Sequence, residues 1–108
     1  MVICDRDAVI ACAGLPKREF AEKSLSPELE KVMVGRALYL YKEGGRKLPV
    51  TAEEGSYFVS CAMPILTEGD VTGCVVSVIR EDIARMPAEL ESKLVRTAAD
   101  FLGKQLEN

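Results

Sequence analysis

The stretch YFVSCAMPILTEGDVTGCVVSVIR, residues 57–80, decides the fold of this 108-residue chain. Two long apolar runs, rich in valine and isoleucine, flank the sequence TEGD at 67–70, which is typical of a turn. The segment therefore predicts a β-hairpin with strands over 57–66 and 71–80. Pro64 falls near the end of the first strand, where its missing N–H donor does least harm.

Strand alternation predicts the pairing within this hairpin. If Leu66 opposes Val71, Cys61 faces Val76 and Met63 faces Cys74. One side then carries Tyr57, Val59, Cys61, Met63, Cys74, Val76 and Val78. The other side carries smaller residues that allow a helix to approach closely, namely Phe58, Ser60, Ala62, Val75, Ser77 and Ile79.

A second hairpin is expected at the N-terminus, where ICDRDAVIACAG spans residues 3–14. The turn residues Asp5 and Asp7 separate two short β-type runs, over 2–5 and 8–13. A three-residue turn pairs Cys4 with Ile10 and Val2 with Cys12. It leaves the two thiols diagonal, about 7 to 8 Å apart, which is too far for a disulfide.

Helix signals occupy three places. Pro16 can open a short helix that runs to Glu22. Ser26 can cap a helix that has Pro27 at its first position and runs to Val34, before Gly35. The third helix is expected over 87–106, where leucines, Ala98 and Phe101 recur at spacings of three and four and form one apolar stripe.

The remaining segments complete the order of elements. Residues 37–41 have strand-like composition, and KEGGRKLPVTAEEGS at 42–56 is the one long loop. We therefore expect an α+β fold in a single domain over 1–108, with an antiparallel sheet and a long C-terminal helix on one face. GAF, PAS and profilin-like domains share this plan.

Composition excludes several classes of function. The net charge of −3 and the pI of about 5.0 argue against a nucleic-acid-binding face. The absence of histidine removes the usual proton-transfer residue and the commonest zinc ligand, so we expect no catalytic residue, no cofactor and no metal. No apolar run is long enough to span a membrane and no signal peptide is present, which favours a cytoplasmic protein with no membrane partner.

Five segments between residues 2 and 107 carry a resemblance to a known family. In chain order they are VICDRDAVIACAG, KREF, EKSLS, PILTEGDVTGCVVSV and TAADFLGKQLE. On these segments the chain resembles the C-terminal GAF domain of the stage V sporulation protein T family of bacterial transcriptional regulators. The resemblance implies a regulatory domain that senses an unidentified small molecule and associates through its helices.

In that family an AbrB-type DNA-binding domain precedes the GAF domain, and a helix precedes the first strand. Neither is present in this sequence, which is therefore expected to be part of a longer protein, with a free-standing GAF-like domain as the alternative. DNA is expected as a partner only through the missing upstream domain. The partners of this chain itself are expected to be a small-molecule ligand and a second copy of the chain.

Two sets of candidate site residues follow. For a ligand we nominate one side of the sheet and its rim, although each residue could equally be plain core: Leu38, Tyr39, Tyr57, Val59, Cys61, Met63, Cys74 and Val76. For a homodimer or higher oligomer we nominate the stripe of the last helix: Leu90, Leu94, Ala98, Phe101, Leu102 and Leu106.

Two other functions remain open. A GAF-fold family reduces free methionine sulfoxide with cysteines, and this chain has Cys4, Cys12, Cys61 and Cys74. No evident cationic partner favours a thiolate at any of them. The other alternative is an assembly module with a filled core and no ligand.

Overall fold

The computed structural model of the protein describes residues 1–53, 55–82 and 85–107. The elements in chain order are β1 (Val2–Cys4), β2 (Val9–Cys12), α1 (Lys17–Phe20), α2 (Pro27–Val34), β3 (Tyr39–Leu40), β4 (Phe58–Thr67), β5 (Asp70–Ile79) and α3 (Ala88–Gln105). The expected order of strands and helices is confirmed. The first helix and the third strand are shorter than expected.

The five strands form one sheet in the order β2-β1-β5-β4-β3, and every neighbouring pair is antiparallel. The predicted β4–β5 hairpin therefore supplies the centre of the sheet, and β1 pairs with the free side of β5. This confirms the α+β class with a C-terminal helix. Among the described residues, no helix is both long and apolar enough to cross a membrane.

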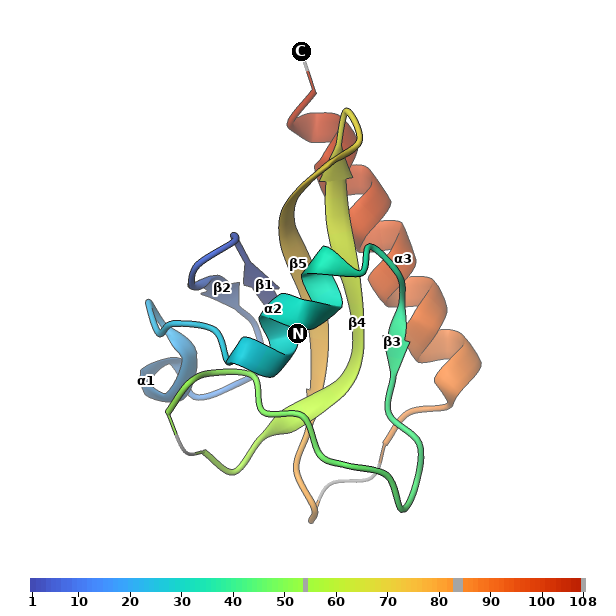
Figure 1. Ribbon diagram of the computed structural model, residues 1–108. Coiled ribbons are helices and arrows are strands. Elements are labelled where there is room, and N and C mark those ends of the chain that lie inside the picture. Colours follow the sequence, from blue (N-terminus) through green and yellow to red (C-terminus); the bar gives the residue numbers. More distant parts are fainter. Residues whose placement is uncertain (54, 83–84, 108) are drawn as a thin grey trace.

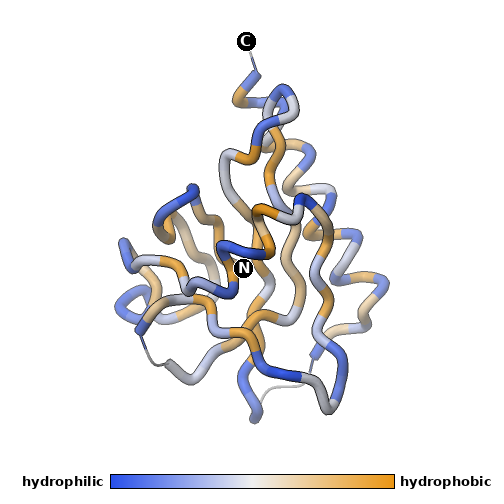
Figure 2. The backbone as a smooth tube through the Cα atoms, in the orientation of Figure 1, coloured by the Kyte–Doolittle hydropathy of each residue, from blue (hydrophilic) through white to orange (hydrophobic). Residues whose placement is uncertain are grey.

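Helices α2 and α3 pack against separate parts of the core, on opposite faces of the sheet. Leu29 and Met33 of α2 belong to a cluster that includes Val59 and Val76. Val95 and Ala99 of α3 belong to a second cluster, with Cys61, Ile65 and Val75. Figure 1 shows α2 across the middle of the strands and α3 running along β4 and β5, and Figure 2 shows how apolar residues concentrate in the strands.

The predicted register of the β4–β5 hairpin holds at the turn and again at the far end, where Val59 opposes Val78, but it is wrong in between. Leu66 opposes Val71 as expected, but Cys61 faces Ser77 and Met63 faces Val75. Irregularities between Ile65 and Leu66 and between Val59 and Cys61 shift the register. Each extra residue reverses the alternation, so Cys61 and Met63 face α3 while Val59 stays on the α2 side.

The N-terminal hairpin shows a smaller shift of the same kind. Val2 opposes Cys12 as expected, but Cys4 opposes Val9 instead of Ile10. Asp5 lies at the turn, where its Oδ1 accepts hydrogen bonds from the backbone N–H groups of Asp7 and Ala8, both at 2.8 Å. These two bonds favour the carboxylate and lower the pKa of Asp5.

Ser26 caps α2 and also ties down the long loop (residues 42–56). Its Oγ accepts a bond from the N–H of Leu29 at 3.0 Å, as predicted, and donates to the carbonyl of Pro49 at 2.6 Å. The N–H of Ser26 donates to the carbonyl of Val50 at 3.0 Å. The long loop is therefore held against the segment that precedes α2.

Candidate functional site

A cleft of about 650 Å³ lies between the long loop and the adjoining ends of β4 and β5. Lys47 lines it from the loop, Tyr57 and Phe58 from the start of β4, and Arg80 and Glu81 from the end of β5. A volume of this size falls within the usual range for small-molecule sites, about 300 to 1,000 Å³.

Two aromatic rings with cations over their faces dominate this cleft. The Lys47 ammonium lies 5.1 Å from the ring centre of Phe58, and the Arg80 guanidinium lies 5.5 Å from that of Tyr57. Both cations are also ion-paired, Lys47 with Glu81 and Arg80 with Asp82. Glu53 and Glu81 also line the cleft, so its charge is balanced, and its distinguishing feature is the pair of aromatic rings.

The interior beneath the long loop is filled with side chains. Val50 is 2% exposed, Val59 0% and Phe58 8%. No hydrogen-bonding side-chain atom buried in the described residues lacks a partner. A ligand therefore has room in the open cleft but not in the core below it.

The structure does not bring the eight nominated ligand residues into one pocket. Tyr57 lines the cleft, and Leu38 lies at a separate groove beside α3. Four of the eight are 0% exposed: Val59, Cys61, Cys74 and Val76. Because of the bulges, the sheet divides the set, with Leu38, Cys61 and Met63 on the α3 side and Tyr39, Tyr57, Val59, Cys74 and Val76 on the α2 side.

The six nominated interface residues of α3 also divide into two groups. Ala98 and Leu102 pack toward the sheet. The other four are exposed large apolar side chains: Leu90 at 50%, Leu94 at 45%, Phe101 at 61% and Leu106 at 57%. The buried face of α3 is instead formed by Glu91, Val95, Ala99 and Gly103.

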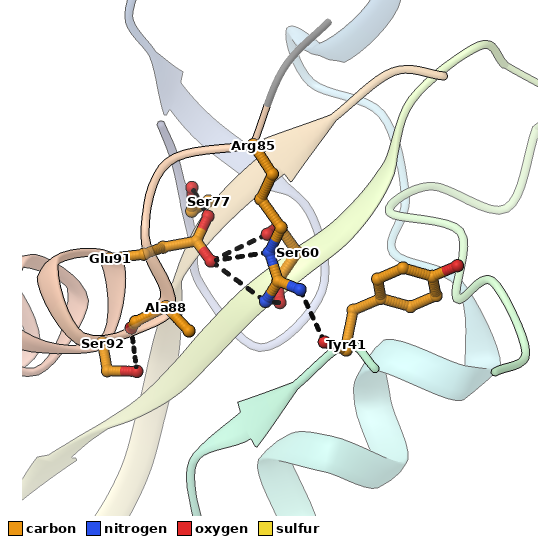
Figure 3. Close-up of polar contacts among 7 residues, drawn as sticks. All are labelled: Tyr41, Ser60, Ser77, Arg85, Ala88, Glu91 and Ser92. Atoms are coloured by element: carbon orange, nitrogen blue, oxygen red, sulfur yellow. Dashed lines mark hydrogen bonds and ion pairs between the residues drawn. The ribbon is translucent and has the colours of Figure 1, made fainter. Parts of the chain in front are cut away.

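A buried polar cluster at the start of α3 escaped the sequence analysis (Figure 3). Glu91 is 1% exposed and accepts hydrogen bonds from the hydroxyls of Ser60 and Ser77, both at 2.8 Å. Arg85 pairs with the same carboxylate at 3.2 Å. The available sequence signal was the spacing of four from Glu91 through Val95 and Ala99 to Gly103, which marks one helical face.

The three buried cysteines show no sign of activation. Burial raises the pKa of Cys4 to about 12, and it also raises the pKa values of Cys61 and Cys74. These three thiols stay protonated at neutral pH, and all four cysteines are free. Thiol catalysis by the buried cysteines therefore has no electrostatic support.

Comparison with known proteins shows the relationship of the chain. Residues 1–107 match the family described as stage V sporulation protein T C-terminal, transcription factor. The chain belongs to this family. It is 36% identical over 110 residues to stage V sporulation protein T of Bacillus subtilis (strain 168), and the alignment covers 99% of this chain and 58% of that protein.

The resemblance noted from the sequence is thus confirmed at the level of the family. Membership of the stage V sporulation protein T C-terminal family supports a role in regulating transcription and argues against an enzyme. The chain spans a little over half of the curated relative, so the activity of a whole regulator is not assigned to it.

Proposed function

We propose that this chain is the regulatory domain of a sporulation transcription factor, which self-associates through α3 and binds a small molecule in the cleft between the long loop and the adjoining ends of β4 and β5. Family membership supports the regulatory part. The proposal assigns DNA contact to a separate AbrB-type domain, in keeping with the net charge of −3.

Self-association is inferred from the exposed side of α3. Leu90, Leu94, Thr97 and Phe101 follow one another at spacings of four, three and four. This is the spacing of a helix–helix seam, here with one polar position at Thr97. Leu90, Leu94 and Phe101 are each at least 45% exposed. A second copy of α3 offers the matching surface, because a twofold axis brings the same residues together.

Replacing Leu94 and Phe101 together by lysine tests this seam. Both side chains are largely exposed, so the variant is expected to fold, as judged by circular dichroism, and to be monomeric by light scattering coupled to size exclusion. Asp100→Lys is the matched control, because it adds a lysine to the same helix outside the seam. A wild-type chain that stays monomeric at high concentration refutes self-association.

The small molecules that we expect in the cleft carry a planar ring that packs against Tyr57 or Phe58. A thermal-shift screen of such compounds is expected to give stabilisation that Tyr57→Ala removes. Tyr39→Ala is the control, because Tyr39 is half-buried on the same side of the sheet and is not among the residues that line the cleft. Stabilisation that survives Tyr57→Ala places the compound elsewhere and refutes this site.

A second candidate function is an assembly module without a ligand. The filled interior beneath the long loop, with Val50 and Val59 almost fully buried, favours it. If no compound stabilises the chain while the lysine variant abolishes self-association, this candidate replaces the first.

A further inference from the structure

Glu91 is an unusual residue for a buried position, because its carboxylate is 1% exposed at the interface between α3 and the sheet. Burying a charge is unfavourable unless hydrogen bonds and an opposite charge compensate for it. Here two serine hydroxyls, from β4 and β5, and the Arg85 guanidinium supply that compensation. These partners therefore help to hold the first turn of α3 against the sheet.

Arg85 connects this carboxylate to the start of the long loop. Its Nη1 donates to the carbonyl of Tyr41 at 2.6 Å, and its Nη2 donates to the carbonyl of Ser60 at 3.1 Å. The same Ser60 carbonyl accepts the N–H of Tyr41 at 2.9 Å. Ser60 lies at the bulge of β4, so the irregularity that upset the predicted pairing also holds both Tyr41 and Arg85 (Figure 3).

On its other side, Tyr41 touches the wall of the cleft. Its ring packs edge-on against Phe58, with 5.3 Å between the ring centres, and the Arg85 guanidinium lies 5.7 Å from the Tyr41 ring. Phe58 lines the cleft and has Lys47 over its face. An unbroken series of contacts thus joins the cleft to Arg85 through Phe58 and Tyr41.

At the other end of the series lies the exposed seam of α3. Glu91 directly follows Leu90 and precedes Leu94 by three residues, so the turn that buries Glu91 also sets the position of both leucines. A shift of this turn changes the surface that the seam presents.

We infer that Arg85 is a positioning residue that couples the long loop to the first turns of α3, so that occupation of the cleft strengthens self-association. This inference rests on the proposed function for its purpose. A ligand that holds the long loop against β4 keeps the Tyr41 carbonyl within reach of Arg85 and thereby fixes α3. By linkage, association of two copies tightens ligand binding by the same factor.

Hydrogen exchange, read by mass spectrometry at a concentration where sedimentation shows only monomer, tests the coupling without any ligand. Arg85→Gln is expected to speed exchange at least about ten-fold both in residues 39–48 and in residues 88–95. Arg96→Gln is the control, since it removes an exposed cation from α3 that makes no bond to Glu91. Faster exchange in 88–95 alone overturns the inference, because Arg85 then only anchors the helix.

A double-mutant comparison tests whether the cleft wall acts through Arg85. Phe58→Leu alone is expected to speed exchange in residues 88–95, and to add nothing when Arg85→Gln is already present. Phe20→Leu is the matched control, because Phe20 packs against Tyr57 and not against Tyr41. Additive effects of Phe58→Leu and Arg85→Gln overturn the inference.

Two further measurements keep the outcomes separate. If Arg85→Gln does not fold, Glu91→Gln, which keeps a hydrogen-bonding side chain, is expected to show the same two-sided pattern with a smaller factor. Self-association is measured independently by sedimentation. If Arg85→Gln speeds exchange in both 39–48 and 88–95 but the chain never associates, the proposed seam and the link to association are refuted. If exchange is faster in 88–95 alone and the chain does associate, only the inference is refuted.

Discussion

At the scale of single residues, position relative to the sheet decides chemistry. Cys4, Cys61 and Cys74 lie inside the core, where burial favours the neutral thiol. Because the pKa of Cys4 is raised to about 12, the buried neutral thiol makes its full contribution to the free energy of unfolding at pH values below the ordinary thiol pKa. That contribution is lost as pH rises from about 8.5 through the raised value.

Thiol labelling checks this description of the cysteines. With a colorimetric thiol reagent at pH 8, the native chain is expected to expose only Cys12, which is half-buried, while the other three react only after unfolding. Cys12→Ser is expected to remove the fast reaction, and Cys61→Ser to leave it unchanged. Fast labelling of Cys4, Cys61 or Cys74 in the native chain would revive the thiol-enzyme alternative.

At the scale of elements, close approach between backbones sets how α3 lies on β4. A Cβ atom added at Gly103 would stand 2.3 Å from the carbonyl oxygen of Leu66, well inside van der Waals contact. Only glycine lets the helix come this near to the strand. Together with the Glu91 cluster at the other end, this contact defines the direction of α3 across the sheet.

Gly103→Ala is therefore expected to lower the free energy of unfolding by about 1 to 3 kcal/mol, since the backbones must separate. Gly35→Ala is the matched control. Gly35 ends α2 with φ −68°, and an added Cβ there would come no closer than 3.4 Å to another atom, the carbonyl oxygen of Val32. The control is expected to change little, or to gain up to about 1 kcal/mol. Equal effects in a urea titration would contradict this account of α3 packing.

At the scale of the whole molecule, α2 covers one face of the sheet and α3 the other, but α3 keeps an apolar seam turned away from the core. Leu90, Leu94 and Phe101 lie exposed along one side of the helix, and apolar patches of this kind are typical of interaction sites. Their burial between two copies would link folding to association.

Such linkage predicts that the midpoint of thermal unfolding, Tm, rises with protein concentration, because association removes folded monomer from the unfolding equilibrium. Differential scanning calorimetry over a hundred-fold range of concentration is the measurement. The variant with lysine at both 94 and 101 is expected to show a constant Tm. A wild-type Tm that is equally constant would contradict association through α3.

The sequence by itself determined the features that depend on neighbours in the chain. Alternation predicted the strands, the turn at 67–70 placed Leu66 opposite Val71, and Ser26 with Pro27 placed the start of α2. These signals are local, because a turn, a cap or an alternating run acts on residues a few positions away. Of the eight nominated ligand residues, Tyr57 lines the cleft.

Only the tertiary structure decided which way the side chains face. The bulge at Ser60 moves Cys61 and Met63 to the α3 side, and no pattern in the local sequence predicts that extra residue. The apolar stripe predicted for α3 packs only partly on the sheet, because Glu91 finds partners from β4, β5 and Arg85, and Gly103 permits close approach. The direction of these side chains and the packing of α3 depend on contacts between residues far apart in the chain, which form only when α3 docks.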